Sequence, residues 1–323
     1  MNSAYGQDAT ADLPDGLHVI LCGTGSPLPD PDRSGPCTLV VAGKQMFLID
    51  AGSSAGRRIG QMMVPLARLD AAFLTHFHSD HIDGLGEVMM LRWAASGRKP
   101  PLPVYGPVGV ERVVAGFNTA YTADFGYRIA HHGADIMPRS CAGGRAMRFD
   151  LPVEPLSLVV LEKGDVRVTA FTVRHDPVEP SVGYRFDYKG RSVVISGDTA
   201  RDDTVATACN GCDLMVHEAL NPDMVGRIQA AARKAGDTRI AKIMSDIPGY
   251  HTSPVEAASI ARQGKAKMLV LTHIVPRMPT ALLHPYFVKG ASAVYSGPII
   301  IGTDGMLFSL PARSGKIERD ALL

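Results

Sequence analysis

Short apolar runs bounded by glycine, proline and polar residues recur along almost the whole chain. Runs of about four to eight such residues are typical of buried β-strands. The pattern predicts strands at residues 17–21, 38–41, 46–49, 71–74, 158–161, 166–173, 182–186, 192–195, 214–216, 268–271 and 298–301.

Segments with a helical period lie between these runs, at residues 84–94, 109–121, 224–235, 254–262 and 282–286. Ser253 and Pro254 have the pattern of an N-cap followed by proline in the first turn. Because the early part is β-rich and strands and helices mix later, we predict an α/β fold with sheets inside and helices outside. Residues 122–148 are the least regular stretch, and we interpret them as a loop near the mouth of a functional site.

Composition is ordinary for a globular protein, with 46% apolar and 20% charged residues among 323. The formal net charge is +1, so binding to nucleic acid would need a local basic patch.

No apolar run approaches the roughly 20 residues of a membrane span. The first sixteen residues are small and polar and do not resemble a signal peptide. We expect a disordered leader at residues 1–16 and a single domain at residues 17–323. As given, the sequence suggests a cytoplasmic protein, or a periplasmic or secreted one if a signal peptide has been trimmed.

The five cysteines are too few, and odd in number, to suggest a disulfide framework. Cys209 and Cys212 form an isolated CxxC pair. A structural zinc site would need further ligands at matching spacing, and only His217 is near. We therefore interpret the pair as incidental or as an optional local disulfide.

The segment Thr75–His81 carries the strongest chemical signal. Three imidazoles and a carboxylate fall within six residues, directly after a predicted strand. Imidazole nitrogen and carboxylate oxygen suit zinc. In extended chain His76 and His78 point the same way, so both can bind one ion, while Asp80 and His81 can face a second ion.

Because one segment cannot supply all the ligands of two ions, others must come from elsewhere in the chain. Three candidates follow predicted strands: His175, Asp198 and His273. Polar residues at strand ends are expected at an open α/β site. Their shared placement favours a common role.

These motifs resemble the metallo-β-lactamase superfamily, in particular its ribonuclease Z and arylsulfatase-like branch. The H-x-H-x-D-H segment at residues 76–81 is the most specific match. The other matches follow in family order and are FLIDAG at 47–52, YGP at 105–107, His175, SGDT at 196–199, HEA at 217–219, HTS at 251–253 and TH at 272–273. The resemblance extends from about residue 17 to residue 310 and implies an αββα sandwich with metals at one edge.

The resemblance also implies two zinc ions, although manganese or iron are possible. It assigns His76, His78 and His175 to the first ion and Asp80, His81 and His273 to the second, with Asp198 bridging them. A bridging carboxylate offsets the charge between two dications, and a water between them ionises near neutral pH and becomes the nucleophile. Asp80 is placed to orient that water, so we expect it to be catalytic as well.

The resemblance gives four further residues a role. His251 matches a residue that helps protonate the leaving oxygen, a step that ester hydrolysis requires. Asp50, His217 and Glu218 match groups that orient the ligands, although Asp50 and Glu218 could equally be buried carboxylates serving the fold.

The chain departs from ribonuclease Z in one respect: only twenty-two residues separate His175 from Asp198, so the tRNA-gripping arm is absent. The basic residues between 227 and 242 are diluted by aspartates and favour a solvated helix face. We therefore expect a dinuclear zinc hydrolase of phosphodiester or sulfate ester bonds that acts on a small anionic ester. We do not expect specific binding of tRNA or association with a membrane, and the protein could form a homodimer. The alternatives are a lactonase or β-lactamase on the same scaffold, and a non-catalytic module that binds metal or nucleic acid.

Overall fold

The computed structural model describes residues 8–96, 99–154 and 156–323. The chain forms two compact units. Unit 1 comprises residues up to 23, 32–150 and 303–323, and unit 2 comprises residues 24–31 and 151–302. Each unit contains one β-sheet and several helices, so the predicted mixed α/β class is confirmed.

The sheet of unit 1 has eight strands among the described residues, in the order β15-β14-β1-β2-β3-β4-β5-β6. Strands β15 to β3 pair antiparallel, and β3 to β6 pair parallel. The strands are β1 (Gly16–Gly23), β2 (Cys37–Ala42), β3 (Gln45–Ile49), β4 (Leu69–Phe73), β5 (Leu102–Gly106), β6 (Gly144–Arg148), β14 (Met306–Pro311) and β15 (Glu318–Ala321). The helices are α1 (Ala55–Gln61), α2 (Ser79–Ile82), α3 (Leu85–Ser96), α4 (Val110–Ala120) and α5 (Thr122–His132), with single turns η1 (Leu66–Arg68) and η2 (Arg139–Cys141).

The sheet of unit 2 has seven strands in the described region, in the order β13-β12-β11-β10-β9-β8-β7. Here β10 to β13 pair parallel, and β7 to β10 pair antiparallel. The strands are β7 (Ser157–Lys163), β8 (Val166–Thr172), β9 (Val182–Tyr188), β10 (Arg191–Ile195), β11 (Leu214–Leu220), β12 (Met268–Val275) and β13 (Ile299–Ile301). The helices are α6 (Asp203–Cys209), α7 (Pro222–Lys234), α8 (Thr238–Asp246), α9 (Pro254–Gln263), α10 (His284–Phe287) and α11 (Ala291–Val294), with turns η3 (Ile247–Gly249) and η4 (Ala281–Leu283).

Every predicted strand is present, with ends that shift by a few residues. Apolar runs identify several of these strands because they are buried on both faces; the residues of β1, β2 and β11 are all buried. Strands β7 and β13 are only partly buried, and their apolar content alone reveals them. The predicted start of α9 is also confirmed. Ser253 Oγ accepts from the Glu256 N–H at 3.2 Å, and the Glu256 carboxylate accepts from the Ser253 N–H at 2.9 Å, which forms a capping box.

The interpretation of residues 122–148 as one irregular loop is wrong. This stretch contains α5, η2 and β6. Helix α5 is held by packing, because Phe125 is buried and meets the ring of Trp93 edge-on with centroids 5.3 Å apart. Such tertiary contacts override the local glycine and proline signals.

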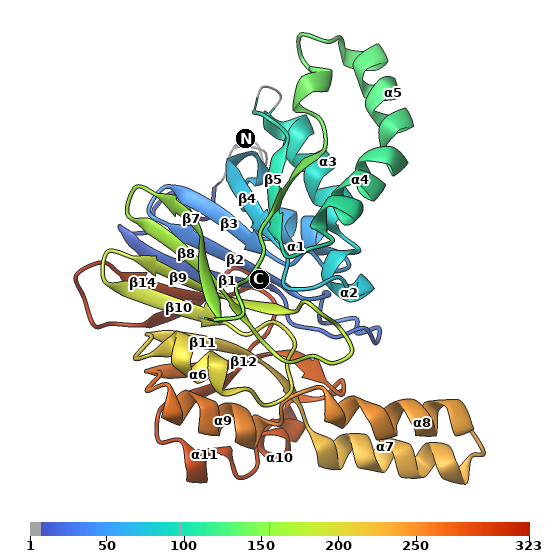
Figure 1. Cartoon of the computed structure of the whole chain (residues 1–323), viewed down its shortest axis with the longest axis vertical. Coiled ribbons are helices and arrows are strands. Elements are labelled where there is room, and N and C mark those ends of the chain that lie inside the picture. Colours follow the sequence, from blue (N-terminus) through green and yellow to red (C-terminus); the bar gives the residue numbers. More distant parts are fainter. Residues whose placement is uncertain (1–7, 97–98, 155) are drawn as a thin grey trace. The chain divides into compact units, whose positions relative to one another are not determined.

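Helices α7 and α8 form a hairpin in unit 2 (Figure 1), and this hairpin contains the basic residues between 227 and 242. The two helices bury Val225 against Met244 and a few apolar neighbours. The basic side chains are exposed, and they are Arg227, Arg233, Lys234, Arg239 and Lys242. No helix in the described part of the chain is long and apolar enough to cross a membrane.

Residues 1–7 of the predicted leader lie outside the described residues. From Asp8 on, the chain packs within unit 1, since the Asp8 carboxylate pairs with Arg68 at 2.6 Å and Thr10 is buried. The extent of the leader, and the expectation of one domain over residues 17–323, stay predictions.

The cysteine count argued against a disulfide framework, and this interpretation is wrong because Cys22 pairs with Cys37. Cys209 pairs with Cys212, which is the optional local disulfide that the CxxC pair left open. The first pair forms because β1 and β2 are neighbours whose register brings the two Cα atoms to 5.0 Å. Strand register is a property of the folded sheet, so cysteine spacing alone could not reveal it. Cys141 keeps its thiol.

These bonds predict the number of thiols. Unfolded without reductant, the protein should react with Ellman's reagent at one thiol per chain, and at five after reduction. Replacing Cys22 and Cys37 with serine should lower the free energy of unfolding by about 3 kcal/mol, because the bond closes a loop of 15 residues. Cys141→Ser is the control and should leave it unchanged. Five reactive thiols before reduction would contradict the structure.

Candidate functional site

In unit 1, the loop that follows β4 places two histidines against each other. His76 Nε2 and His78 Nδ1 lie 3.1 Å apart. Two nitrogens that bind the same tetrahedral zinc, each at about 2.0–2.1 Å, lie about 3.3 Å from one another. The spacing of the two nitrogens is therefore compatible with two ligands of one ion.

Asp50 supports this loop from the end of β3. Its carboxylate accepts from the Thr75 N–H and the Thr75 hydroxyl, both at 2.8 Å, and from His81 Nδ1 at 2.8 Å. Because the Thr75 hydroxyl donates to Asp50, it accepts from His76 Nδ1, 3.0 Å away. Both rings therefore carry their proton on Nδ1, and Nε2 is the nitrogen that can bind a metal.

Asp80 and His81 lie on the single turn α2 and are buried. His81 Nε2 is 3.7 Å from the Asp80 carboxylate. The His81 carbonyl accepts from the Ala51 N–H, which ties α2 to the segment after β3. Gly52 lies so close to this turn that a Cβ atom there would collide with the Asp80 carbonyl oxygen. This close approach explains the glycine of the FLIDAG motif.

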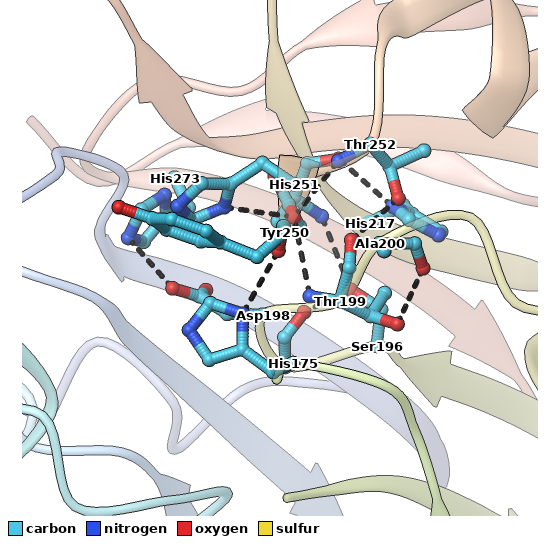
Figure 2. Close-up of polar contacts among 12 residues, drawn as sticks. His175, Ser196, Asp198, Thr199, Ala200, His217, Tyr250, His251, Thr252 and His273 are labelled. Atoms are coloured by element: carbon cyan, nitrogen blue, oxygen red, sulfur yellow. Dashed lines mark hydrogen bonds and ion pairs between the residues drawn. The ribbon is translucent and has the colours of Figure 1, made fainter. Parts of the chain in front are cut away.

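In unit 2, Asp198 and His273 form another close pair of possible metal ligands (Figure 2). His273 Nε2 lies 3.2 Å from the Asp198 carboxylate, and both side chains are almost fully buried. His273 is an extra residue in β12, since Glu218 pairs with Thr272 and Ala219 with Ile274. Its φ is +46°, in the left-handed region, so this bulge directs the ring toward Asp198 at some cost in backbone strain.

His175, after β8, is oriented by the backbone. Its Nδ1 donates to the Tyr250 carbonyl at 2.9 Å, so Nε2 is again the nitrogen that can bind a metal. Burial lowers the pKa of the His175 imidazole, although the Asp198 carboxylate opposes this shift. A lowered pKa favours the neutral ring, which is the form that binds metal.

Glu218 is the centre of a hydrogen-bond network in unit 2. Its Oε1 accepts from the Thr199 N–H at 3.2 Å, the Thr252 N–H at 3.1 Å and His251 Nδ1 at 3.0 Å. The Thr252 hydroxyl donates to the Thr199 carbonyl at 2.6 Å. One buried carboxylate thus joins the segment after Asp198 to the segment that carries His251.

His251 lies among the metal-binding candidates of unit 2. Its ring stacks on His273 with centroids 5.4 Å apart and meets His175 at 5.3 Å. One ligand atom each of Asp198, His251 and His273 lies within 4.8 Å of the other two. Because Nδ1 is bound to Glu218, His251 presents Nε2 to this group.

His217 differs from the other predicted residues. Its Nδ1 donates to the neighbouring Glu218 carbonyl at 2.8 Å, and the ring is fully buried. Burial lowers the pKa of the His217 imidazole. Among the described residues it bonds to none of the candidate ligands, so its orienting role stays a prediction.

Each unit therefore gathers its own share of the predicted residues. Imidazole nitrogen and carboxylate oxygen are the donors that zinc and other divalent metals accept, and no thiolate is among them. Sequence reasoning gave no role to Thr75, Thr199, Tyr250 or Thr252. Thr199 and Thr252 lie within the matched motifs and Thr75 and Tyr250 lie next to them, but their hydrogen bonds depend on the fold.

Comparison with known proteins agrees with this chemistry. A family model described as a beta-lactamase superfamily domain matches residues 45–274. Ribonuclease Z of Mycobacterium bovis is 36% identical over 293 residues, which cover 89% of this chain and 96% of that protein. Ribonuclease Z of Mycolicibacterium paratuberculosis is 38% identical over 81% of this chain and 87% of its own.

Solved structures show the same fold. The short form of human tRNase Z has a TM-score of 0.66 and 23% identity, covering 91% of this chain and 99% of that one. The metallo-β-lactamase fold protein YhfI of Bacillus subtilis has a TM-score of 0.64 and 22% identity, covering 92% and 100%. The chain is a metal-dependent hydrolase of the metallo-β-lactamase fold, and it belongs to the ribonuclease Z family of the beta-lactamase superfamily.

Proposed function

We propose that the protein is a phosphodiesterase that uses two zinc ions and cleaves RNA. The observation that carries the proposal is the arrangement in unit 2, where the Asp198–His273 pair stands beside His251, itself held by Glu218. A metal-binding pair next to a histidine that can hold a proton has what cleavage of a phosphodiester needs. Opening a lactam or lactone ring would call for an oxyanion donor as well.

The ligands are proposed to divide between two ions. His76, His78 and His175 would hold one, and Asp80, His81 and His273 the other, with Asp198 shared. Support comes from the fixed tautomers of His76, His81 and His175, each with Nδ1 occupied by a protein acceptor. When bound, two dications supply positive charge for an anionic ester and lower the pKa of a shared water. Asp80 would orient that water.

His251 is proposed to protonate the leaving oxygen. Glu218 accepts from Nδ1, so the carboxylate stabilises the doubly protonated ring. Cleavage breaks the bond between phosphorus and the leaving oxygen, and the proton on Nε2 passes to that oxygen. The ring keeps its Nδ1 proton and its bond to Glu218. The two backbone N–H groups on Oε1 fix the carboxylate, so His251 stays aimed at the same point.

RNA is proposed as the substrate because the similarity to ribonuclease Z covers almost the whole of both chains. This replaces the small anionic ester that the sequence pattern favoured. Between His175 and Asp198 the chain forms only β9 and β10, joined by a tight turn between Tyr188 and Arg191, so this described segment has no room for an inserted arm. We therefore expect the protein to hold RNA mainly through phosphate contacts.

Asp198→Ala should remove both metal and activity. The wild-type protein should bind about two equivalents of zinc, and the variant clearly fewer, because both ions lose a shared ligand. Turnover of bis-p-nitrophenyl phosphate should fall by roughly a thousandfold or more. Elemental analysis and steady-state kinetics measure both effects. Asp203→Ala, an exposed carboxylate on α6, is the matched control. Two retained equivalents and normal turnover in Asp198→Ala would rule out the bridge.

His251→Ala should separate proton donation from metal binding. The variant should keep near-normal zinc and lose ~10²–10⁴ in turnover on esters with poor leaving groups. Good leaving groups such as p-nitrophenolate need less protonation and should lose less. The measurement is kcat/KM over a series of substituted phenyl phosphodiesters. Equal losses across the series, or loss of zinc, would show that His251 shapes or ligates the site instead.

A substrate panel tests the reaction itself. The protein should cleave a precursor tRNA and bis-p-nitrophenyl phosphate faster than p-nitrophenyl sulfate, a lactone or nitrocefin. Its affinity for RNA should fall steeply with salt, as expected of phosphate contacts. Preferred hydrolysis of the sulfate ester, the lactone or nitrocefin would reject the phosphodiesterase proposal. Salt-insensitive, tight RNA binding would reject the expected mode of binding.

A further inference from the structure

The side chain of Tyr250 contacts two of the candidate residues of the unit 2 site, His175 and His251. The residue ends the turn η3 and directly precedes His251. Its half-buried ring meets the His175 ring edge-on, with centroids 5.4 Å apart, and lies 5.0 Å from the His251 ring. The phenol ring therefore packs against both a candidate metal ligand and the candidate proton donor, whose own rings are 5.3 Å apart.

The backbone of Tyr250 has a separate task. Its carbonyl fixes His175, and its N–H donates to the Ile247 carbonyl at 3.3 Å. Any residue with the same backbone can perform this task. The task does not explain why an aromatic ring with a hydroxyl group stands here.

The hydroxyl of Tyr250 has no hydrogen-bond partner anywhere in the described part of the chain. Tyr295 offers a contrast in the same unit, since its buried hydroxyl donates to the Ala266 carbonyl at 2.9 Å. A polar group that leaves water without a partner costs free energy. A half-buried donor without a protein partner, held next to reacting groups, is thus suited to an acceptor that arrives with a ligand.

We propose that Tyr250 is a substrate-binding residue whose hydroxyl donates a hydrogen bond to a non-bridging oxygen of the phosphodiester. The inference rests on the proposed function. The Tyr250 ring contacts the His251 ring, so an ester that receives a proton from His251 would lie beside this side chain. The non-bridging oxygens carry the negative charge of the ester, and a neutral donor aimed at them stabilises that charge.

Tyr250→Phe isolates the hydroxyl, because it keeps the ring contacts with both histidines and the carbonyl that holds His175. In metal-loaded protein, kcat/KM for bis-p-nitrophenyl phosphate should fall about ten- to hundredfold, the usual effect of one lost bond to a charged group. The affinity for inorganic phosphate, measured by calorimetry, should weaken as well. Zinc content and Tm should not change. Tyr286→Phe is the matched control: this half-buried tyrosine of unit 2 lies under Arg227 and should behave as wild type.

The two readouts keep this inference separate from the proposed function. If the wild type cleaves diesters and Tyr250→Phe matches it in rate and phosphate affinity, the inference is wrong. A loss of zinc in Tyr250→Phe would also overturn it, since the hydroxyl would then serve metal binding. If the wild type cleaves no diester, the proposed function fails, and the phosphate affinities of the two proteins still decide whether Tyr250 binds the anion.

Discussion

Asp198 and His273 are only 3% and 2% exposed, and their donor atoms face each other at 3.2 Å. An ionised carboxylate removed from water costs free energy unless a cation or good hydrogen bonds compensate for it. A metal ion provides that compensation for several such groups at once. The fold is consistent with this requirement, because it buries imidazoles and carboxylates together and fixes their orientation through hydrogen bonds to backbone and neighbouring side chains.

The parallel part of each sheet supplies most of these side chains. In unit 1 they follow β3 and β4, and in unit 2 most lie at or after the ends of β10, β11 and β12. His175 is the exception, because it follows β8 in the antiparallel part of the sheet. Two of them sit in strained backbone, since φ is +55° at Asp50 and +46° at His273. A strained residue persists when the surrounding structure over-determines it, which is common where a side chain must point in one direction.

The central strands were predictable from sequence because burial on both faces leaves continuous apolar runs. The candidate metal ligands of unit 1 were predictable because His76, His78, Asp80 and His81 stand in one short segment. What sequence could not supply depends on three-dimensional register. The Cys22–Cys37 bond needs β1 beside β2, and helix α5 depends on Phe125 meeting Trp93. Tyr250 carries no motif of its own, and only its distances to His175 and His251 draw attention to it.

We propose that two metal ions with only nitrogen and oxygen ligands perform the chemistry. X-ray absorption at the zinc edge, on protein loaded with zinc and freed of excess metal, tests it most directly. We expect nitrogen and oxygen neighbours at about 2.0–2.2 Å and a second zinc at about 3.5–4 Å. Sulfur neighbours at about 2.3 Å, or the absence of any metal neighbour in fully loaded protein, would contradict it.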